Sequence, residues 1–139
     1  MSRVPAVIAA SGLVLLVVGT FLPWLRSGTV DRNSYQAAAV AGEFLGAPAF
    51  RLWLGVPLLG ALCVALFVLG LARTAATVTA LFATAAAVVA VLATVRTGGS
   101  SAVSVSPSGP ATTLIGAVIA LTGAAAAVLV ARPRTGGVP

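Results

Sequence analysis

The chain has 139 residues, of which 60% are hydrophobic and 7% charged, and its eight basic against two acidic residues give a net charge of +6. A soluble domain carries about 25% charged residues, so a chain this apolar cannot cover itself with a water-facing surface and must be surrounded largely by lipid. The basic residues are all arginines that stand at the ends of apolar runs, as in membrane proteins, which argues against nucleic-acid binding.

Four uncharged apolar runs define the predicted architecture. Each has roughly 20 residues, which at about 1.5 Å per residue is enough to cross a hydrocarbon core of about 30 Å. Each run is predicted to be an α-helix, because backbone polar groups in lipid must be satisfied within the chain. We therefore predict an all-α fold, a four-helix transmembrane bundle forming a single domain over residues 1–132, with a disordered tail at 133–139. The predicted spans are 4–22, 52–72, 74–95 and 112–131.

The first run could also be a cleaved signal peptide, because Arg3 gives it a short positive start. Its apolar core is longer than that of a usual signal peptide, and its exit, TFLPWLRSG, lacks a small-x-small cleavage pattern. We favour a retained helix that ends at Pro23, with Trp24 at the membrane interface.

The long connection 24–51 follows this helix and is predicted to form an extracytoplasmic cap. The chain's two acidic residues and most of its aromatic residues lie in or beside it. Within it, NSYQAAAVAGEFLG favours a short interfacial helix that starts at Asn33 or the next serine and stops at Gly46 and Pro48, with an irregular loop as the alternative. Linkers are usually rich in Gly and Ser and poor in aromatic residues, so we predict an ordered cap.

The charged side chains of the cap suit two roles. They can close the loop through exposed ion pairs, each contributing about 0 to 1 kcal/mol, which is the role we favour. They can also form a docking face for a protein partner or a lipid headgroup, with two arginines holding a phosphate beside aromatic rings. Arg26, Arg32 and Arg96 are the candidates to pair with Asp31, and Arg51 the candidate to pair with Glu43. The candidate docking face comprises Trp24, Arg26, Asp31, Arg32, Tyr35, Glu43, Arg51 and Trp53.

The second and third runs are separated by a single arginine, Arg73, which predicts an antiparallel helix pair with a very tight turn. Pro57 lies in the second run and predicts a bend near its loop-side end, because it removes the hydrogen bond to the carbonyl of Trp53. Trp24 and Trp53 are predicted to mark one membrane interface.

The connection 97–111, TGGSSAVSVSPSGPA, predicts a flexible polar loop, and its alternating AVSVS is a weak signal for a short extended piece. Small residues recur at helical spacing in the third and fourth runs and allow close helix packing. We favour packing within one bundle over docking to another protein. The stripes are Ala76, Ala80, Ala83, Ala87 and Ala90 in the third run, and Gly116, Ala120 and Ala124 in the fourth.

The chain offers little for catalysis. It has one cysteine, Cys63, and no histidine, which excludes an intramolecular disulfide and a Cys/His metal site. It also lacks a Ser–His or Cys–His pair and a glycine-rich phosphate-binding motif. We predict no catalytic residue, no cofactor and no metal, and we expect Cys63 to be a small buried side chain.

The orientation rests on small differences, since four arginines fall on each side of the membrane in a four-span topology. Arg132 and Arg134 form the densest basic cluster, and the two long connections share the opposite side. We favour a multi-pass protein of the plasma (cytoplasmic) membrane with both termini cytoplasmic.

The motif PW-L-RSG, followed by DRNSYQ and then three further spans, resembles small four-helix membrane proteins common in actinobacteria. The resemblance covers the layout and roughly twenty residues, and it implies a topology but no activity. The leading hypothesis is therefore a non-enzymatic accessory or structural membrane protein that docks an envelope protein or lipid through its first extracytoplasmic loop. The alternative is a lipid-handling or small-solute transport component that works as a homo-oligomer or with a partner. An enzyme ranks third.

Overall fold

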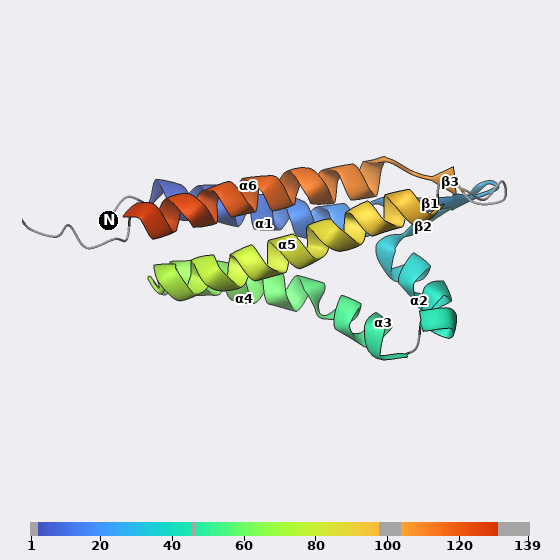
Figure 1. Cartoon of the computed structure of the whole chain (residues 1–139), viewed down its shortest axis with the longest axis horizontal. Coiled ribbons are helices and arrows are strands. Elements are labelled where there is room, and N and C mark those ends of the chain that lie inside the picture. The colour runs from blue at the N-terminus through green and yellow to red at the C-terminus, as the bar shows by residue number, and fades with distance from the viewer. Residues whose placement is uncertain (1–2, 46, 98–103, 131–139) are drawn as a thin grey trace, which may run out of the picture.

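The computed structural model describes residues 3–45, 47–97 and 104–130. Most of this chain is helical, which confirms the main part of the predicted all-α class, and a small sheet is an addition to it (Figure 1). The elements are α1 (Val4–Phe21), β1 (Pro23–Ser27), β2 (Val30–Asn33), α2 (Ser34–Leu45), α3 (Ala47–Leu54), α4 (Val56–Val68), α5 (Ala72–Thr97), β3 (Ser104–Val105) and α6 (Ser108–Val130).

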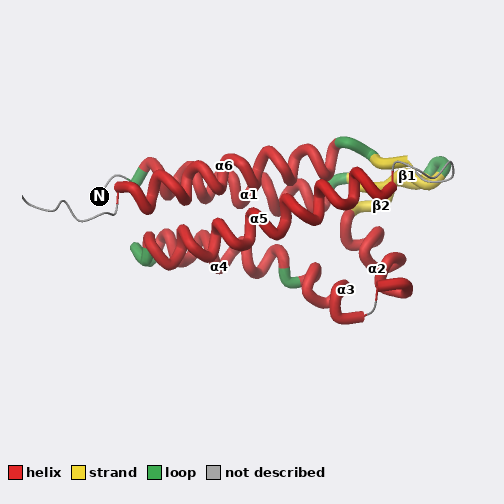
Figure 2. The backbone as a smooth tube through the Cα atoms, in the orientation of Figure 1, coloured by secondary structure: helices red, strands yellow, loops and turns green. Residues whose placement is uncertain are grey.

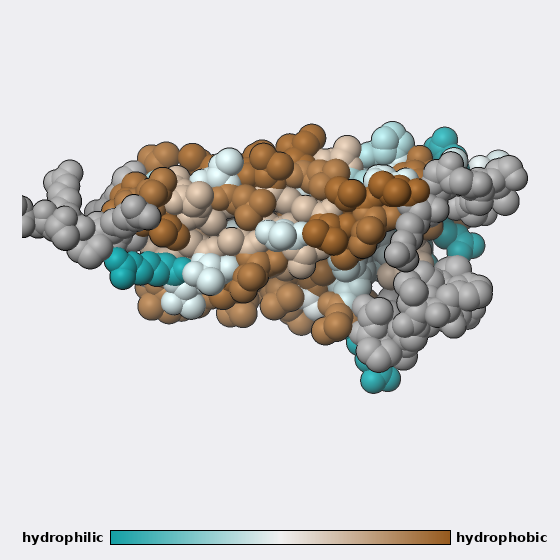
Figure 3. All heavy atoms as spheres, viewed as in Figure 1, coloured by the Kyte–Doolittle hydropathy of each residue, from teal (hydrophilic) through white to brown (hydrophobic). Residues whose placement is uncertain are grey.

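Three helices in the described chain, α1, α5 and α6, are long and apolar enough to cross a membrane. Hydrophobic residues cover much of the bundle along its length, and hydrophilic residues lie toward its ends (Figure 3). These features identify a membrane protein. The remaining apolar helix, α4, has 13 residues and is therefore only about 20 Å long.

The second predicted span, 52–72, is not one helix. The helix α3 ends at Leu54, and α4 begins at Val56 after an interruption at Gly55 (Figure 2). Pro57 lies in the first turn of α4, where its missing N–H removes no helical hydrogen bond. The predicted bend is therefore a break between two helices.

The tight turn predicted between the second and third runs is confirmed directly after α4. The N–H of Gly70 donates to the carbonyl of Phe67, and the N–H of Leu71 donates to the carbonyl of Leu66, each at 3.1 Å. Gly70 has a φ of +77°, which glycine adopts without steric cost. This arrangement satisfies the last carbonyls of α4 and reverses the chain. Arg73 lies in the first turn of α5 rather than in the turn itself.

Glycines bring the backbones of α1 and α6 into contact. A Cβ atom added to Gly12 would lie 2.8 Å from the carbonyl oxygen of Gly116, and one added to Gly116 would lie 2.8 Å from the carbonyl oxygen of Gly12. Gly123 lies in the same way against the backbone of Ala9. The small residues of α6 therefore serve packing inside the bundle, as favoured from the sequence. Close packing of this kind stabilises helix pairs in lipid, where the hydrophobic effect gives no drive.

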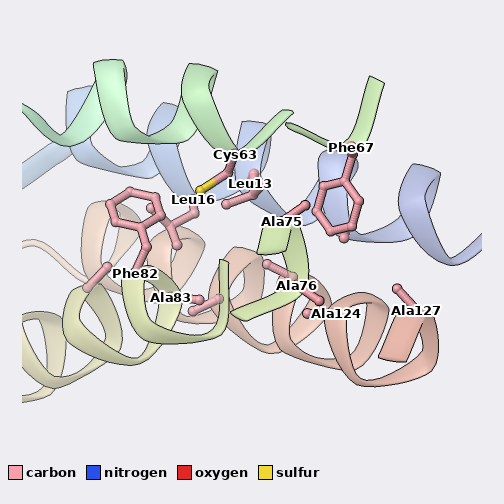
Figure 4. Packing of buried hydrophobic residues seen from close by; sticks show 14 of the residues in the cluster. Leu13, Leu16, Cys63, Phe67, Ala75, Ala76, Phe82, Ala83, Ala124 and Ala127 are labelled. Atoms are coloured by element: carbon pink, nitrogen blue, oxygen red, sulfur yellow. The ribbon is translucent and has the colours of Figure 1, made fainter. Parts of the chain in front are cut away.

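The buried core lies between the α1–α6 pair and the α4–α5 pair, and Figure 4 shows Cys63 within it, near Leu13 and Leu16. Cys63 is fully buried, as predicted. The hydroxyl oxygen of Thr79 is buried near this thiol, and within the described chain it has no hydrogen-bond partner of ordinary geometry. The nearby thiol is only a weak donor. Of the predicted α5 stripe, Ala76, Ala83 and Ala90 are buried, whereas Ala80 and Ala87 are partly exposed.

The helices share two common ends. Arg3 before α1, Gly70 in the α4–α5 turn and Val130 at the end of α6 line one groove, so they lie together at what we call the termini end. The strands and α2 lie at the opposite, cap end (Figure 1). Thus α1 and α5 both run from the termini end to the cap end, and α6 returns. The predicted tail 133–139 lies outside the described residues, and so does the part 98–103 of the predicted flexible loop. The rest of that loop is ordered, because 104–105 forms β3 and 108–111 belongs to the start of α6.

Candidate docking cap

The cap begins with a β-hairpin that we did not predict from the sequence. Strands β1 and β2 pair antiparallel, with Ser27 opposite Val30 and Arg26 opposite Asp31. The two-residue loop between them starts at Gly28, whose φ of +61° suits a tight hairpin turn. The hairpin carries Arg26, Asp31 and Arg32, three of the charged residues of the first connection, beyond the end of α1.

A third strand ties the two long connections together. Strand β3 pairs with β1 on the side opposite β2, with Leu25 facing Val105, and the strand order is β2-β1-β3. The N–H of Ser106 also donates to the carbonyl of Trp24 at 3.0 Å. The short extended piece suggested by AVSVS is therefore confirmed at Ser104–Val105. The sheet fixes the start of α6 to the end of α1.

The predicted short helix after the hairpin is confirmed as α2. Its start is closed by a reciprocal capping box, in which the N–H of Gln36 donates to Oδ1 of Asn33 at 3.0 Å and the N–H of Asn33 donates to Oε1 of Gln36 at 3.2 Å. The helix ends at Leu45, where a stop was predicted, but a further helix, α3, begins at Ala47.

Trp24 anchors the cap to the bundle. Its indole Nε1 donates to the carbonyl of Gly19 at 2.9 Å, and its side chain is only 4% exposed. Gly109 of α6 leaves the space for the ring, since a Cβ atom there would collide with the indole. The ring of Trp53 makes an edge contact with it, at a centroid distance of 5.9 Å. The two tryptophans therefore lie together and the buried Trp24 positions the cap, while their place at a membrane interface stays a prediction.

Hydroxyl groups complete the junction between α1 and the cap. The hydroxyl of Ser34 donates to the carbonyl of Thr20 at 2.5 Å and accepts a hydrogen bond from Nε1 of Trp53 at 3.0 Å. The hydroxyls of Thr20 and Tyr35 lie 2.9 Å apart. The last carbonyls of a helix have no partner within it, so the bond from Ser34 satisfies the carbonyl of Thr20, which would be costly to leave unpaired near lipid. The carbonyl of Gly19 accepts a second hydrogen bond, from the N–H of Leu22 at 3.3 Å.

Tyr35 is half-buried against α1. Its ring packs on that of Phe21 at a centroid distance of 5.0 Å. Burial raises the pKa of its phenol, and the hydrogen bond with Thr20 opposes this in part. Tyr35 therefore stays neutral at physiological pH and ties α2 to the end of α1.

The tip of the hairpin carries one ion pair. The guanidinium of Arg26 donates from Nε to Asp31 Oδ1 at 2.7 Å and from a terminal nitrogen to Oδ2 at 3.1 Å. Both side chains are exposed, at 58% and 41%. Of the three arginines considered for Asp31, Arg26 pairs with it, and the side chain of Arg96 lies outside the described residues. The hydrogen bonds from Arg26 hold the pKa of the Asp31 carboxyl below its ordinary value.

We expect this pair to contribute stability only where Asp31 is ionised. Its folded pKa is lowered, so the contribution is complete above its ordinary value of 3.8 and is lost as the pH falls through the lower, folded value. The carboxyl resonance of Asp31, followed by NMR, should titrate below 3.8, and Arg26→Gln should move the midpoint back up. An unchanged midpoint in Arg26→Gln would show that the pair does not form. Between pH 5 and 8 this pair should leave the stability of the cap constant.

The other candidate residues separate into two groups. Arg32 in β2 and Trp53 in α3 are partly buried, whereas Arg51 is exposed near the end of α3. The side chain of Glu43 lies outside the described residues, and so does its predicted pairing with Arg51. Sequence reasoning did not single out Thr20, Ser34 or Gly109 as parts of the junction. The available signals were the hydroxyl of Thr20 near the end of the first apolar run and that of Ser34 at the predicted helix start.

In its described residues, the cap brings together ion-pairing, aromatic and hydroxyl side chains but no nucleophile with a base. Among the described residues, no group of three His, Cys, Asp or Glu side chains could hold a metal ion. The arrangement suits recognition of another molecule by an ordered, charged surface. Comparison of the chain with protein-family models, curated proteins and solved structures finds no match.

Proposed function

We propose that this chain is a non-enzymatic accessory protein of the cytoplasmic membrane, which docks an envelope protein through the exposed face of its cap. It crosses the membrane four times, with both termini in the cytoplasm. The observation that carries the proposal is the construction of the cap: three strands and α2 are fixed to the helix ends by buried hydrogen bonds, while Arg26, Asp31 and Arg51 remain exposed.

The direction of the helices supports four crossings. Helices α1 and α5 are parallel, so the chain between them must return from the cap end to the termini end. The helix α4, preceded by α3, makes this return in the structure (Figure 2). With α6 as the last crossing, the two termini lie on the same side.

The packing of the bundle favours docking over transport. In the part of the chain that the structure describes, four polar side chains are buried, namely Thr20, Ser34, Thr79 and Thr113. Thr20 and Ser34 belong to the cap junction, and Thr113 donates to the carbonyl of Gly109 within α6. A solute pathway needs polar groups along a continuous channel at membrane depth. The contact between α1 and α6 leaves no room for one between them.

Photo-crosslinking in native membranes tests the docking proposal. A photoreactive amino acid at Thr29, in the exposed hairpin loop, should trap a defined partner protein, whereas one at Leu81, 70% exposed on the lipid-facing side of α5, should not. Arg32→Ala should weaken the Thr29 adduct while the protein inserts and accumulates as before. Equal adducts from both positions, or an adduct indifferent to Arg32→Ala and Arg26→Ala, would refute docking through the cap.

The orientation has its own test. Single cysteines replacing Thr29 and Thr135 in a Cys63→Ser background should react differently with a membrane-impermeant reagent in intact cells. We expect labelling at Thr29 and protection at Thr135 until the membrane is opened. The opposite pattern would show that the termini face outward. Labelling at both positions would place them on the same side of the membrane, which contradicts four crossings.

A further inference from the structure

At the termini end, the α1–α6 pair and the α4–α5 pair leave a groove of about 690 Å³ between them. Its walls come from α1, α4 and α6, with Ala6 and Ala10 on α1, Phe67 on α4 and Ala127 on α6. This volume falls within the usual range for a site that holds one small ligand, about 300 to 1,000 Å³. The groove lies at the end opposite the cap, so it has no part in the proposed docking face.

The groove is apolar inside and opens toward the surroundings of the bundle. Val7 on α1, Val68 on α4 and Val130 on α6 all line it and are largely exposed. From Arg3 to Ala10 its wall follows two turns of α1, a depth of about 10 Å. In a bilayer this is the depth of the headgroup region and the upper acyl chains, so hydrocarbon rather than water is the natural filling.

Among the described residues, the charged side chains at the mouth of the groove are those of arginines. Arg3 lines the groove, is exposed and stands at the N-cap of α1, where the helix dipole adds further positive potential. Arg73 follows Ala72, which also lines the groove. The two acidic side chains of the whole chain belong to β2 and α2 at the other end. A phosphate group would meet the guanidinium of Arg3 here and no carboxylate side chain.

We infer that this groove holds one anionic phospholipid, with its phosphate at Arg3 and part of an acyl chain between the α1–α6 pair and the α4–α5 pair. Guanidinium groups bind phosphate oxygens through paired, charge-assisted hydrogen bonds. The acyl chain fills the space that the diverging helices leave and so replaces missing helix–helix contacts with close packing. Selectivity for an anionic lipid comes from the contact between its headgroup and Arg3, and the groove accommodates the acyl chain.

Native mass spectrometry of the full chain, purified in mild detergent with equal amounts of phosphatidylglycerol and phosphatidylcholine, tests this inference. The parent should retain one phosphatidylglycerol, in preference over phosphatidylcholine by about fivefold, as expected for one arginine near an anionic headgroup. Arg3→Gln should bring this ratio close to one. Ala6→Phe, which fills the groove, should reduce the retention of both lipids. Glycerol phosphate alone should not displace the lipid, because it cannot fill the groove.

Matched variants control for charge and bulk. Arg96→Gln removes the same charge near the end of α5 at the cap end, and Val18→Phe adds bulk on the exposed face of α1 away from the groove. Neither should change lipid retention. If the parent retains both lipids equally, or if Arg96→Gln lowers the ratio as much as Arg3→Gln, the site is wrong. If the parent is a dimer that Ala6→Phe dissociates with lipid retention unchanged, a second copy occupies the groove and the inference fails. If Ala6→Phe does not fold, Ala10→Phe replaces it as the variant that fills the groove, and Arg3→Gln still tests the contact with the phosphate.

Discussion

Replacing Gly116 by valine is expected to lower the free energy of unfolding by about 3 kcal/mol or more, at the upper end of the usual cost of overpacking. The added Cβ atom meets the backbone of Leu16 and the carbonyl oxygen of Gly12, and backbone cannot move aside as a side chain can. The helices α1 and α6 must separate, and their contacts along the bundle weaken together. Unfolding by sodium dodecyl sulfate in mixed micelles measures the loss.

The matched control is Ala125→Val on the exposed face of α6, which should leave stability nearly unchanged. Gly12→Val should be as damaging as Gly116→Val, because the two glycines face each other. The double variant should cost less than the sum, since one separation of the helices relieves both collisions. If Gly116→Val unfolds at the same detergent fraction as Ala125→Val, the two helices do not touch in this way.

The second large effect is expected at Trp24, where alanine should cost about 3 to 5 kcal/mol, as for other buried tryptophans. The substitution empties the space above Gly109, removes the edge contact with Trp53 and leaves the carbonyl of Gly19 without its indole donor. Trypsin provides a direct readout, because it cleaves after arginine. We expect the folded parent to resist cleavage at Arg26, and Trp24→Ala to be cut there rapidly.

Two conservative variants separate the parts of this effect. Trp24→Phe keeps most of the ring but loses the N–H, and should cost about 1 to 2 kcal/mol. Trp53→Phe loses the hydrogen bond to Ser34 and part of the ring contact with Trp24, but at a partly buried site, and should cost less than Trp24→Phe. Rapid cleavage of the folded parent at Arg26 would show that the cap is not ordered, whatever the variants do.

The helices of the bundle were predictable because lipid imposes a strong rule on the sequence. An uncharged run of about 20 residues has few alternatives to a helix, and α1 follows the predicted span 4–22 to within one residue. The second run shows the limit of this reasoning. Its hydropathy is continuous through Gly55 and Pro57, so composition alone does not show that one helix ends and another begins there. The start of α6 at Ser108, ahead of the predicted Thr112, was hidden by its polar first turn.

The cap was predictable as an ordered region, but its architecture was not. Asn33 and Ser34 are local signals for a helix start, and they identified the start of α2 correctly. The reciprocal bonds between Asn33 and Gln36 were seen only in the structure. The β-hairpin was missed because its strands are short and its turn signal is a single glycine, Gly28. Its third strand depends on residues 78 or more positions further along the chain, as in the contact between Arg26 and Ser104. Pairing at such a separation leaves little trace in the local sequence.

The brevity of α4 has a consequence for the bilayer itself. For a chain that crosses four times, three helices match a hydrocarbon thickness of about 30 Å, whereas α4 covers about 20 Å. The mismatch lies on the flank of the bundle that α4 forms. It falls on the cap side of that flank, because α3 departs from the bundle axis there (Figure 1). Lipids along that flank must shorten or tilt, at a cost of a fraction of a kcal/mol for each ångström. The protein would then thin its leaflet on one side only and concentrate where the membrane is already thin.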